Sequence, residues 1–98
     1  MNMGRTLAEV YEYGEAIRAI ATRHHGLAIS VIGSVARGED GPASDIDFLV
    51  EFGPGASLVD LMDMQDDLEA LLGRPVDVLS VGGLKERDEH ILREAVLL

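Results

Sequence analysis

The sequence predicts an α/β fold: one small mixed β-sheet flanked by helices, in the order helix, strand, short helix, strand, helix, strand, helix. Three observations predict it. Segments with apolar residues at helical spacing alternate with short runs of β-branched and aliphatic residues. Glycine or proline stands near most of the boundaries between them. The 98 residues suit one domain, which we expect to span residues 1–98.

The first half of the chain contains four of the predicted elements. A capping-box pattern at Thr6-Leu-Ala-Glu9, followed by apolar residues at helical spacing, predicts a helix from Leu7 to His25. The apolar, β-branched run from Leu27 to Ile32 favours a strand. A single helical turn at Ser34 to Arg37 precedes a glycine, and a second strand is expected from Ser44 to Phe52.

The second half supplies the remaining elements. Ser57 and Asp60 open a helix that Gly73 closes, with an apolar stripe of Leu58, Leu61, Met62, Leu68, Leu71 and Leu72. A third strand is expected from Pro75 to Ser80. The last segment, Leu84 to Leu98, is predicted to be a helix with inward-facing Ile91, Leu92, Ala95 and Val96.

The order of the elements predicts how the three strands pair. The strands at 44–52 and 75–80 flank a helix, and such a right-handed βαβ unit makes them parallel. The strands at 27–32 and 44–52 are joined by a short connection, which favours antiparallel pairing. The end of the first strand should therefore lie beside the starts of the other two.

Composition excludes several classes of function. The chain has 8 basic and 18 acidic residues and a net charge of −10, so its field repels nucleic acid and suits a basic protein partner. Without cysteine, thiol catalysis, thiolate metal sites and disulfides are excluded, and a cytoplasmic location is the simplest expectation. No apolar run is long enough to predict a membrane span.

Three carboxylates are predicted to gather at the shared edge of the strands. Asp45 and Asp47 are two residues apart in a strand, so their side chains leave the same face. Such a pair repels itself unless a cation lies between the two groups, and oxygen ligands of this kind suit Mg²⁺. Asp77 opens the parallel neighbouring strand, and a third carboxylate allows two ions, as in two-metal phosphoryl transfer.

A glycine-serine turn faces these carboxylates. Gly33 allows a phosphate to approach the backbone, and the amides of the following turn, with the Ser34 hydroxyl, form an anion cradle. Arg37, about one helical turn further on, offers a forked donor to phosphate, although it is equally suited to pair with Glu39 or Asp40. Each feature alone has a simpler explanation as a solvated strand end or loop, and only the combination predicts catalysis.

This combination resembles the signature of the DNA polymerase β-like nucleotidyltransferase superfamily. The matching residues are Gly33-Ser34-Val35-Ala36-Arg37-Gly38 and Ser44-Asp45-Ile46-Asp47-Phe48-Leu49-Val50, and the flanking segments resemble the minimal nucleotidyltransferase branch. The resemblance implies that Gly33, Ser34, Arg37 and Ser44 bind the nucleotide triphosphate. It also implies that Asp45, Asp47 and Asp77 are catalytic, that they hold Mg²⁺, and that Asp77 helps to activate the acceptor.

The resemblance further implies an antitoxin that transfers AMP from ATP to a tyrosine of a HEPN-type ribonuclease toxin. The chain has little sequence left after the fold to build an acceptor pocket, which favours a protein acceptor. Two alternatives stay open: a non-catalytic antitoxin that occludes its toxin, and a small-molecule or RNA nucleotidyltransferase that completes its pocket by oligomerising. Nucleotide preference and oligomeric state are not readable from the residues.

The histidines and the acidic helix face are expected to carry no chemistry. His24 and His25 are adjacent at a helix end, where their charge would oppose the helix dipole. His90 is expected on a solvated helix face, with partner binding as the alternative. Asp60, Asp63 and Asp67 are expected on the water-facing side of their helix, opposite its leucines.

Overall fold

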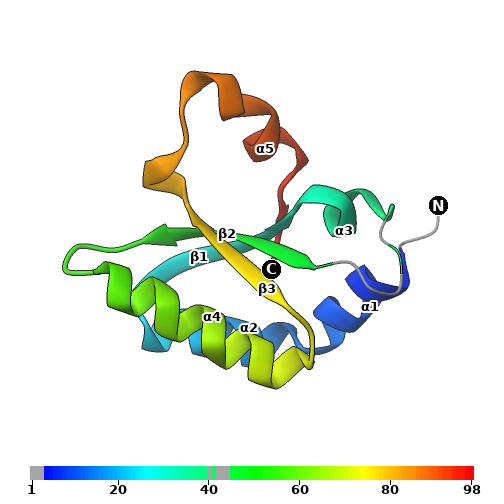
Figure 1. Cartoon of the computed structure of the whole chain (residues 1–98), viewed down its shortest axis with the longest axis horizontal. Coiled ribbons are helices and arrows are strands. Elements are labelled where there is room, and N and C mark those ends of the chain that lie inside the picture. The colour runs from blue at the N-terminus through cyan, green and yellow to red at the C-terminus, as the bar shows by residue number, and fades with distance from the viewer. Residues whose placement is uncertain (1–3, 40, 42–44) are drawn as a thin grey trace.

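The computed structural model describes residues 4–39, 41 and 45–98 and has a mixed four-stranded sheet with helices on both sides (Figure 1). In chain order the elements are α1 (Arg5–Glu12), α2 (Gly14–Arg23), β1 (Gly26–Ile32), α3 (Gly33–Arg37), β2 (Ile46–Phe52), α4 (Leu58–Leu72), β3 (Val76–Ser80), α5 (Glu89–Glu94) and β4 (Val96–Leu97). Two short 3₁₀ turns, Val81–Gly83 and Glu86–Asp88, join β3 to α5. The predicted fold class is confirmed.

The sheet has the strand order β3-β2-β1-β4. β1 and β2 are antiparallel, whereas β2 and β3 are parallel, with Asp47 opposite Asp77 in the register. Both pairings agree with the prediction. They place the end of β1 beside the starts of β2 and β3, which is the edge at which the sequence predicts the site.

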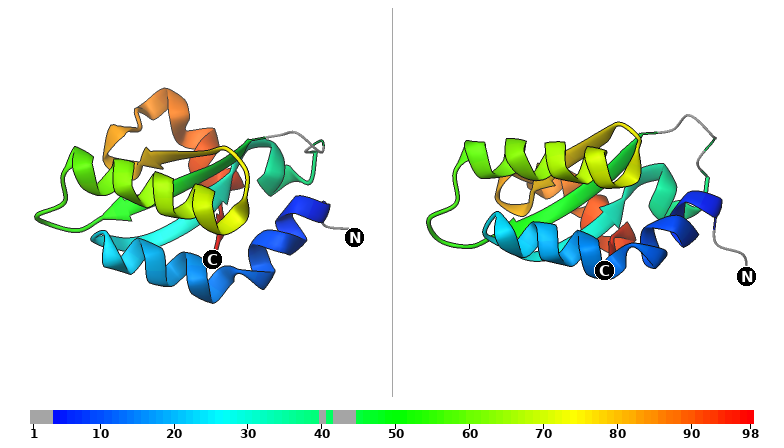
Figure 2. Two further views of the ribbon diagram at one scale, coloured as in Figure 1. Left: turned by 60° about the horizontal axis from the view of Figure 1, so that its bottom comes forward. Right: turned by 90° about the horizontal axis from the view of Figure 1, so that it is seen from below.

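The apolar core lies between one face of the sheet and the helices α1, α2 and α4. α2 and α4 lie side by side across this face, and α5 with the 3₁₀ turns stands on the opposite side (Figure 2). Alternation along β2 sends Ile46, Phe48 and Val50 into this core, and all three are at most 1% exposed. We call this side of the sheet the helix-covered face and the other side the α5 face.

The long first helix of the prediction is wrong, because the structure has α1 and α2 with a break at Tyr13. Apolar spacing continues across the break, so the periodicity gives no sign of it. Gly14, which is buried, is the only local signal, since glycine weakens a helix interior. The predicted capping box is also wrong: Gly4 is the N-cap, and the buried Thr6 accepts a hydrogen bond from Arg74.

The last predicted helix is also wrong over much of its length. Only Glu89–Glu94 is α-helical, and the chain then extends into β4, which pairs antiparallel with β1. Leu98 donates a backbone hydrogen bond to Ile29 at 3.0 Å. The outer edge of β1 offers backbone groups that must be satisfied, and this non-local pairing overrides the helical pattern of the segment.

α4 follows the prediction at its ends, and four of the six residues of its predicted apolar stripe lie in the core or pack against it: Leu61, Leu68, Leu71 and Leu72. Ser57 and Asp60 form the predicted capping box, and Gly73 ends the helix in the left-handed conformation. Met64 and Leu68 are fully buried, but Leu58 and Met62 of the predicted stripe are 70% and 56% exposed. The sheet covers only part of the helix circumference, so these two positions face away from the core.

Candidate active site

Two of the predicted acids lie side by side on the α5 face of the sheet. Asp47 and Asp77 are direct register partners on the parallel strands β2 and β3. Because side chains alternate along a strand, Asp47 points away from the core that its neighbours Ile46 and Phe48 enter. Asp47 is half-buried and Asp77 is exposed, so the pair borders solvent where a substrate can reach it.

Asp45 lies one residue before β2 and is exposed. The pKa of Asp47 is raised first by burial, and then by the negative charges of Asp77 and Asp45. A hydrogen bond that the protonated form shares with Asp77 adds to this increase. Asp45 and Asp77 therefore both lie close enough to act electrostatically on Asp47.

Gly33 lies directly against Asp47. Its φ is +73°, a left-handed value that favours glycine, and a Cβ built on it would lie 2.9 Å from Oδ2 of Asp47. Any larger residue would therefore strain the backbone and push the carboxylate away. Glycine at this position is what allows the turn into α3 and the acid pair to share one small volume.

The turn formed by α3 follows the sequence prediction closely. It runs from Gly33 to Arg37 and ends at Gly38, which is left-handed with φ +72°. Val35 of this turn is buried in the core, whereas Ser34 is half-buried and its carbonyl accepts a hydrogen bond from Glu39 at 2.9 Å. Ser44, also predicted to bind nucleotide, lies outside the described residues.

Arg37 is held by two carboxylates. Its Nε donates to Glu39 and its NH1 to Glu94 of α5, each at 3.0 Å. These two hydrogen bonds raise the pKa of Arg37 above its usual value. Glu39 is one of the two carboxylate partners that the sequence analysis considered for Arg37, whereas Glu94 was not foreseen as a partner.

Asp47, Asp77 and Gly33 open into a cavity of about 380 Å³, whose walls include neither Asp45 nor Ser34. One wall consists of the predicted residues Gly33, Arg37, Asp47 and Asp77. The other wall comes from α5, which contributes His90, Ile91 and Glu94. The sequence analysis did not foresee that these three residues line the site, because no local pattern indicates that α5 folds back over it. His90 is nevertheless exposed, as expected.

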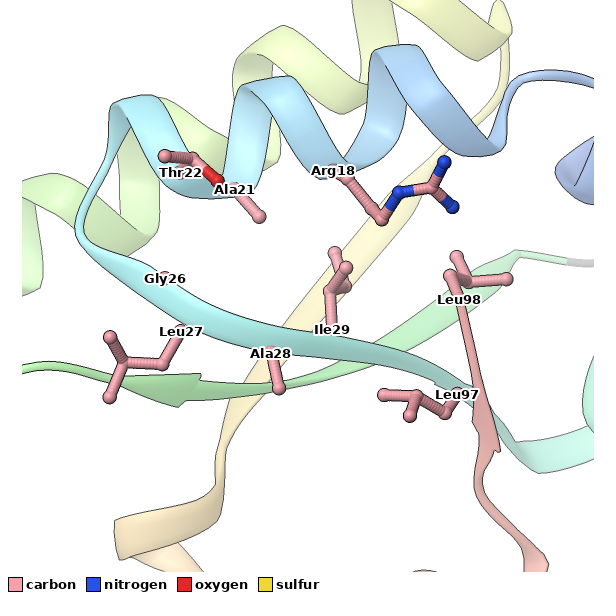
Figure 3. A pocket seen from close by; sticks show the side chains of 9 residues that line it. All are labelled: Arg18, Ala21, Thr22, Gly26, Leu27, Ala28, Ile29, Leu97 and Leu98. Carbon is pink, nitrogen blue, oxygen red and sulfur yellow. The ribbon is translucent and has the colours of Figure 1, made fainter.

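A second cavity, of about 260 Å³, lies at the outer edge of the sheet between α2, β1 and β4 (Figure 3). Its walls are mainly aliphatic, with Arg18 at the rim and no carboxylate among them. It lacks the chemistry of the first cavity. The acid-lined cavity beneath α5 is therefore the candidate active site.

The donors at the candidate site fit Mg²⁺. Among residues 4–39, 41 and 45–98, no group of three or more His, Cys, Asp or Glu side chains is preassembled to hold a metal ion. Mg²⁺, however, is commonly bound by one or two carboxylates together with water and substrate phosphates. The pKa of Asp47 is raised mainly by burial and, in addition, by the negative charges of Asp77 and Asp45, and a bound cation would relieve this repulsion between hard oxygen donors.

The fold and the site together define a small α/β nucleotidyl-transfer protein: carboxylates on adjacent strands face a glycine-serine turn. Residues 14–97 match the family described as the nucleotidyltransferase domain, and the chain belongs to this family. It is therefore a nucleotidyltransferase, and the resemblance drawn from its sequence is confirmed. No helix in the described part of the chain is long and apolar enough to cross a membrane.

Two of its relatives are named as protein adenylyltransferases, one of them provisionally. A Methanocaldococcus jannaschii protein, provisionally named protein adenylyltransferase MJ0435, is 44% identical over 88 residues, covering 89% of this chain and 95% of that protein. Protein adenylyltransferase MntA of Thermococcus cleftensis is 42% identical over 69 residues, covering 69% of this chain and 70% of that protein.

Solved structures agree with the fold. One that is provisionally described as a minimal nucleotidyltransferase has a TM-score of 0.85 and 42% identity, covering 94% of this chain and 95% of that one. A toxin-antitoxin complex with AMP-PNP contains a chain with a TM-score of 0.72 and 16% identity, covering 85% of this chain and 69% of that one. At this identity the second match shows the fold alone.

Proposed function

We propose that the chain is a Mg²⁺-dependent protein adenylyltransferase that transfers AMP from ATP to a tyrosine of a HEPN-type ribonuclease toxin, and so acts as its antitoxin. One observation carries the proposal. Asp47 and Asp77 are register partners beside Gly33, in a chain 44% identical to a protein named as a protein adenylyltransferase. The absence of cysteine favours a cytoplasmic setting.

Each residue of the candidate site has a role in this proposal. Gly33 and Ser34 would admit the triphosphate to the backbone of the turn, and Ser44 is assigned to nucleotide binding from the sequence alone. Asp45, Asp47 and Asp77 would hold two Mg²⁺ ions, which would neutralise the triphosphate and the departing pyrophosphate. Arg37 contacts phosphate after exchanging one of its two carboxylate partners.

The transfer step conserves atoms and charge. The tyrosine oxygen attacks the α-phosphorus of ATP and forms a new P–O bond, while the bond between the α-phosphorus and the bridging oxygen breaks. Pyrophosphate leaves, and the hydroxyl proton passes to Asp77, which is exposed at the mouth of the site. The products are the adenylylated tyrosine and pyrophosphate.

Intact-mass measurement of the partner tests the proposal. The proposed HEPN-type toxin partner is incubated with the chain, ATP and Mg²⁺, and we expect a mass increase of one adenylate on a tyrosine. Asp47→Asn should abolish the increase, whereas Glu51→Gln, an exposed position on the same strand, should leave it unchanged. An unmodified partner under these conditions would refute the proposal.

The same variants separate the proposal from its two alternatives. If Asp47→Asn still neutralises the toxin in cells as well as the wild type does, the non-catalytic antitoxin is the correct description. If labelled ATP is turned over on RNA or small molecules without any protein partner, the third function is correct. Loss of both modification and neutralisation in Asp47→Asn supports the adenylyltransferase.

A further inference from the structure

Three apolar side chains at the start of α4 are exposed. Leu58, Val59 and Met62 are 70%, 63% and 56% exposed, which is unusual for residues of this size. Leu58 and Val59 precede Met62 by four and three residues, and this spacing makes each of them a neighbour of Met62 on the helix surface. We call these three residues the α4 patch. No described part of the chain covers them.

A cavity adjoins the α4 patch. It has a volume of about 290 Å³, and its walls include Phe52 at the end of β2, together with Leu58 and Leu61. A contiguous apolar surface with a hollow beside it is typical of a protein interaction site. Met62 adds a flexible side chain that adapts to different partners.

Negative charge continues the same helix face. Asp63 and Asp66 are exposed, and no ion pair involves either of them within the described residues. In contrast, Asp60 and Asp67 are paired with His25 and His24 at the end of α2. The sequence has no lysine or arginine between Asp45 and Gly73, so no basic residue of this segment balances these acids.

The negative charge and the apolar surface together indicate which class of molecule can bind to the α4 patch. A symmetric pair of copies would bring Asp63 and Asp66 of both chains into one interface, which like-charge repulsion disfavours. Nucleic acid and anionic membranes are repelled by the same charges. A protein segment that carries both apolar and basic side chains satisfies both parts of the surface.

We propose that the α4 patch is a docking site for an amphipathic helix of a protein partner. The apolar face of that helix covers Leu58, Val59 and Met62, and lysines or arginines on its rim approach Asp63 and Asp66. The proposal rests on the proposed function only in that the chain has a protein partner.

The α4 patch is remote from the candidate active site. β2 runs from Asp47 near its start to Phe52 beside the patch, and a strand of its seven residues spans roughly 20 Å. A partner docked at the patch therefore leaves the acid-lined cavity open. The docking helix and the acceptor residue are separate parts of the partner, so docking affects acceptor binding and not ATP binding.

A synthetic peptide tests the docking site directly. The probe is an amphipathic helix with leucines on one face and lysines along both rims, titrated by calorimetry at physiological salt without ATP. Two variants of the chain are compared, Met62→Glu in the patch and Ala70→Glu at an exposed position near the other end of α4. Both add the same charge to the same helix.

Docking at the α4 patch and simple charge attraction predict different effects of Met62→Glu on the affinity for the peptide. We expect Met62→Glu to weaken binding of the peptide by about tenfold or more, although it makes the chain more acidic. Ala70→Glu should leave the affinity unchanged or slightly tighter. Equal affinities for the two variants, or no binding by the wild type, would overturn the proposal.

Further measurements test whether a second copy of the chain or a membrane, instead of a partner helix, covers the α4 patch. A dimer of the chain alone that Met62→Glu dissociates would assign the patch to a second copy, and Met62-dependent binding to phosphatidylserine vesicles would assign it to a membrane. Either result overturns the proposal. Because the peptide assay needs no catalysis, it stays decisive even if adenylyl transfer fails. With the toxin as acceptor, Met62→Glu should raise KM for the toxin and leave KM for ATP unchanged.

Discussion

The two faces of the sheet differ in what they bury. On the helix-covered face, Phe48 is fully buried beneath the helices in one apolar cluster. On the α5 face, its neighbour Asp47 is half-buried beside Asp77. Adjacent residues of one strand thus serve opposite purposes, because alternation sends one side chain to the core and the next to the site. Stability and chemistry are divided between the two faces.

The largest expected effect is on the helix-covered face. Phe48→Ala should destabilise the protein by about 3–5 kcal/mol, because it removes a fully buried aromatic side chain and leaves a cavity. Leu49, its neighbour on the other face, is 4% exposed but lies outside the main apolar cluster. Leu49→Ala should cost less. Chemical denaturation of both variants measures the difference, and equal losses would contradict the division.

The second-largest effect is expected on the α5 face, from a substitution in the turn at Gly33. Gly33→Ala places a Cβ 2.9 Å from Oδ2 of Asp47 at a φ of +73°, and such backbone strain costs about 1–3 kcal/mol. The displaced carboxylate should also lower adenylyl transfer. As a control, Gly55→Ala has a similar positive φ but no atom within 4 Å of the added Cβ. We expect both variants to lose stability in thermal denaturation, and only Gly33→Ala to lose activity.

A smaller effect is expected at the beginning of α4. Ser57→Ala removes the side chain of the capping box, which should cost about 1 kcal/mol of unfolding free energy. The catalytic rate at saturating substrate should not change, because Ser57 lies at the end of the sheet opposite the acids. Urea unfolding together with a rate measurement checks both expectations. A parallel fall in rate would show that the two ends of the sheet are coupled.

The smallest effect concerns the acid pair itself. The pKa of Asp47 is raised above 3.8, mainly by burial and then by Asp77 and Asp45. At low pH Asp47 is protonated in both the folded and the unfolded state. As pH rises above 3.8, the unfolded state ionises first, so the wild type loses stability relative to Asp47→Asn until pH passes the folded pKa.

Thermal denaturation of the wild type and Asp47→Asn across this pH range measures the gap. We expect the variant to be the more stable protein at neutral pH. Mg²⁺ should narrow the gap by stabilising the wild type, because a cation relieves the repulsion among the carboxylates. A gap that shrinks as pH rises would show that the carboxylates are not in conflict.

Much of the fold could be predicted because its signals are local. The capping box at Ser57 and Asp60, the glycines at 33, 38 and 73, and the order strand-helix-strand each determine a nearby backbone shape. The break at Tyr13 could not be predicted from periodicity, since the apolar spacing is the same on both sides of it. The strand β4 could not be predicted either, because its hydrogen bonds go to β1, far away in the chain.

The candidate site also contains residues that the sequence could predict and residues that it could not. The order of the elements was enough to place Asp47 beside Asp77, since parallel pairing of β2 and β3 follows from it, whereas Asp45 lies one residue before β2 and outside the cavity wall. The positions of His90, Ile91 and Glu94 in the cavity wall were not foreseeable. α5 is a short helix whose path depends on where β4 attaches, and its local sequence does not encode that attachment.

The sequence by itself therefore determined the class of fold, the pairing of Asp47 with Asp77 and the glycine turn, because these depend on periodicity, on the order of the elements and on backbone conformations that few residues adopt. Only the tertiary structure decided that α5 covers the site and that Arg37 donates a hydrogen bond to Glu94. It also decided that Leu58 and Met62 face outward. The physical reason is the same in each case. Contacts between distant segments are set by which surfaces remain uncovered once the local elements have formed.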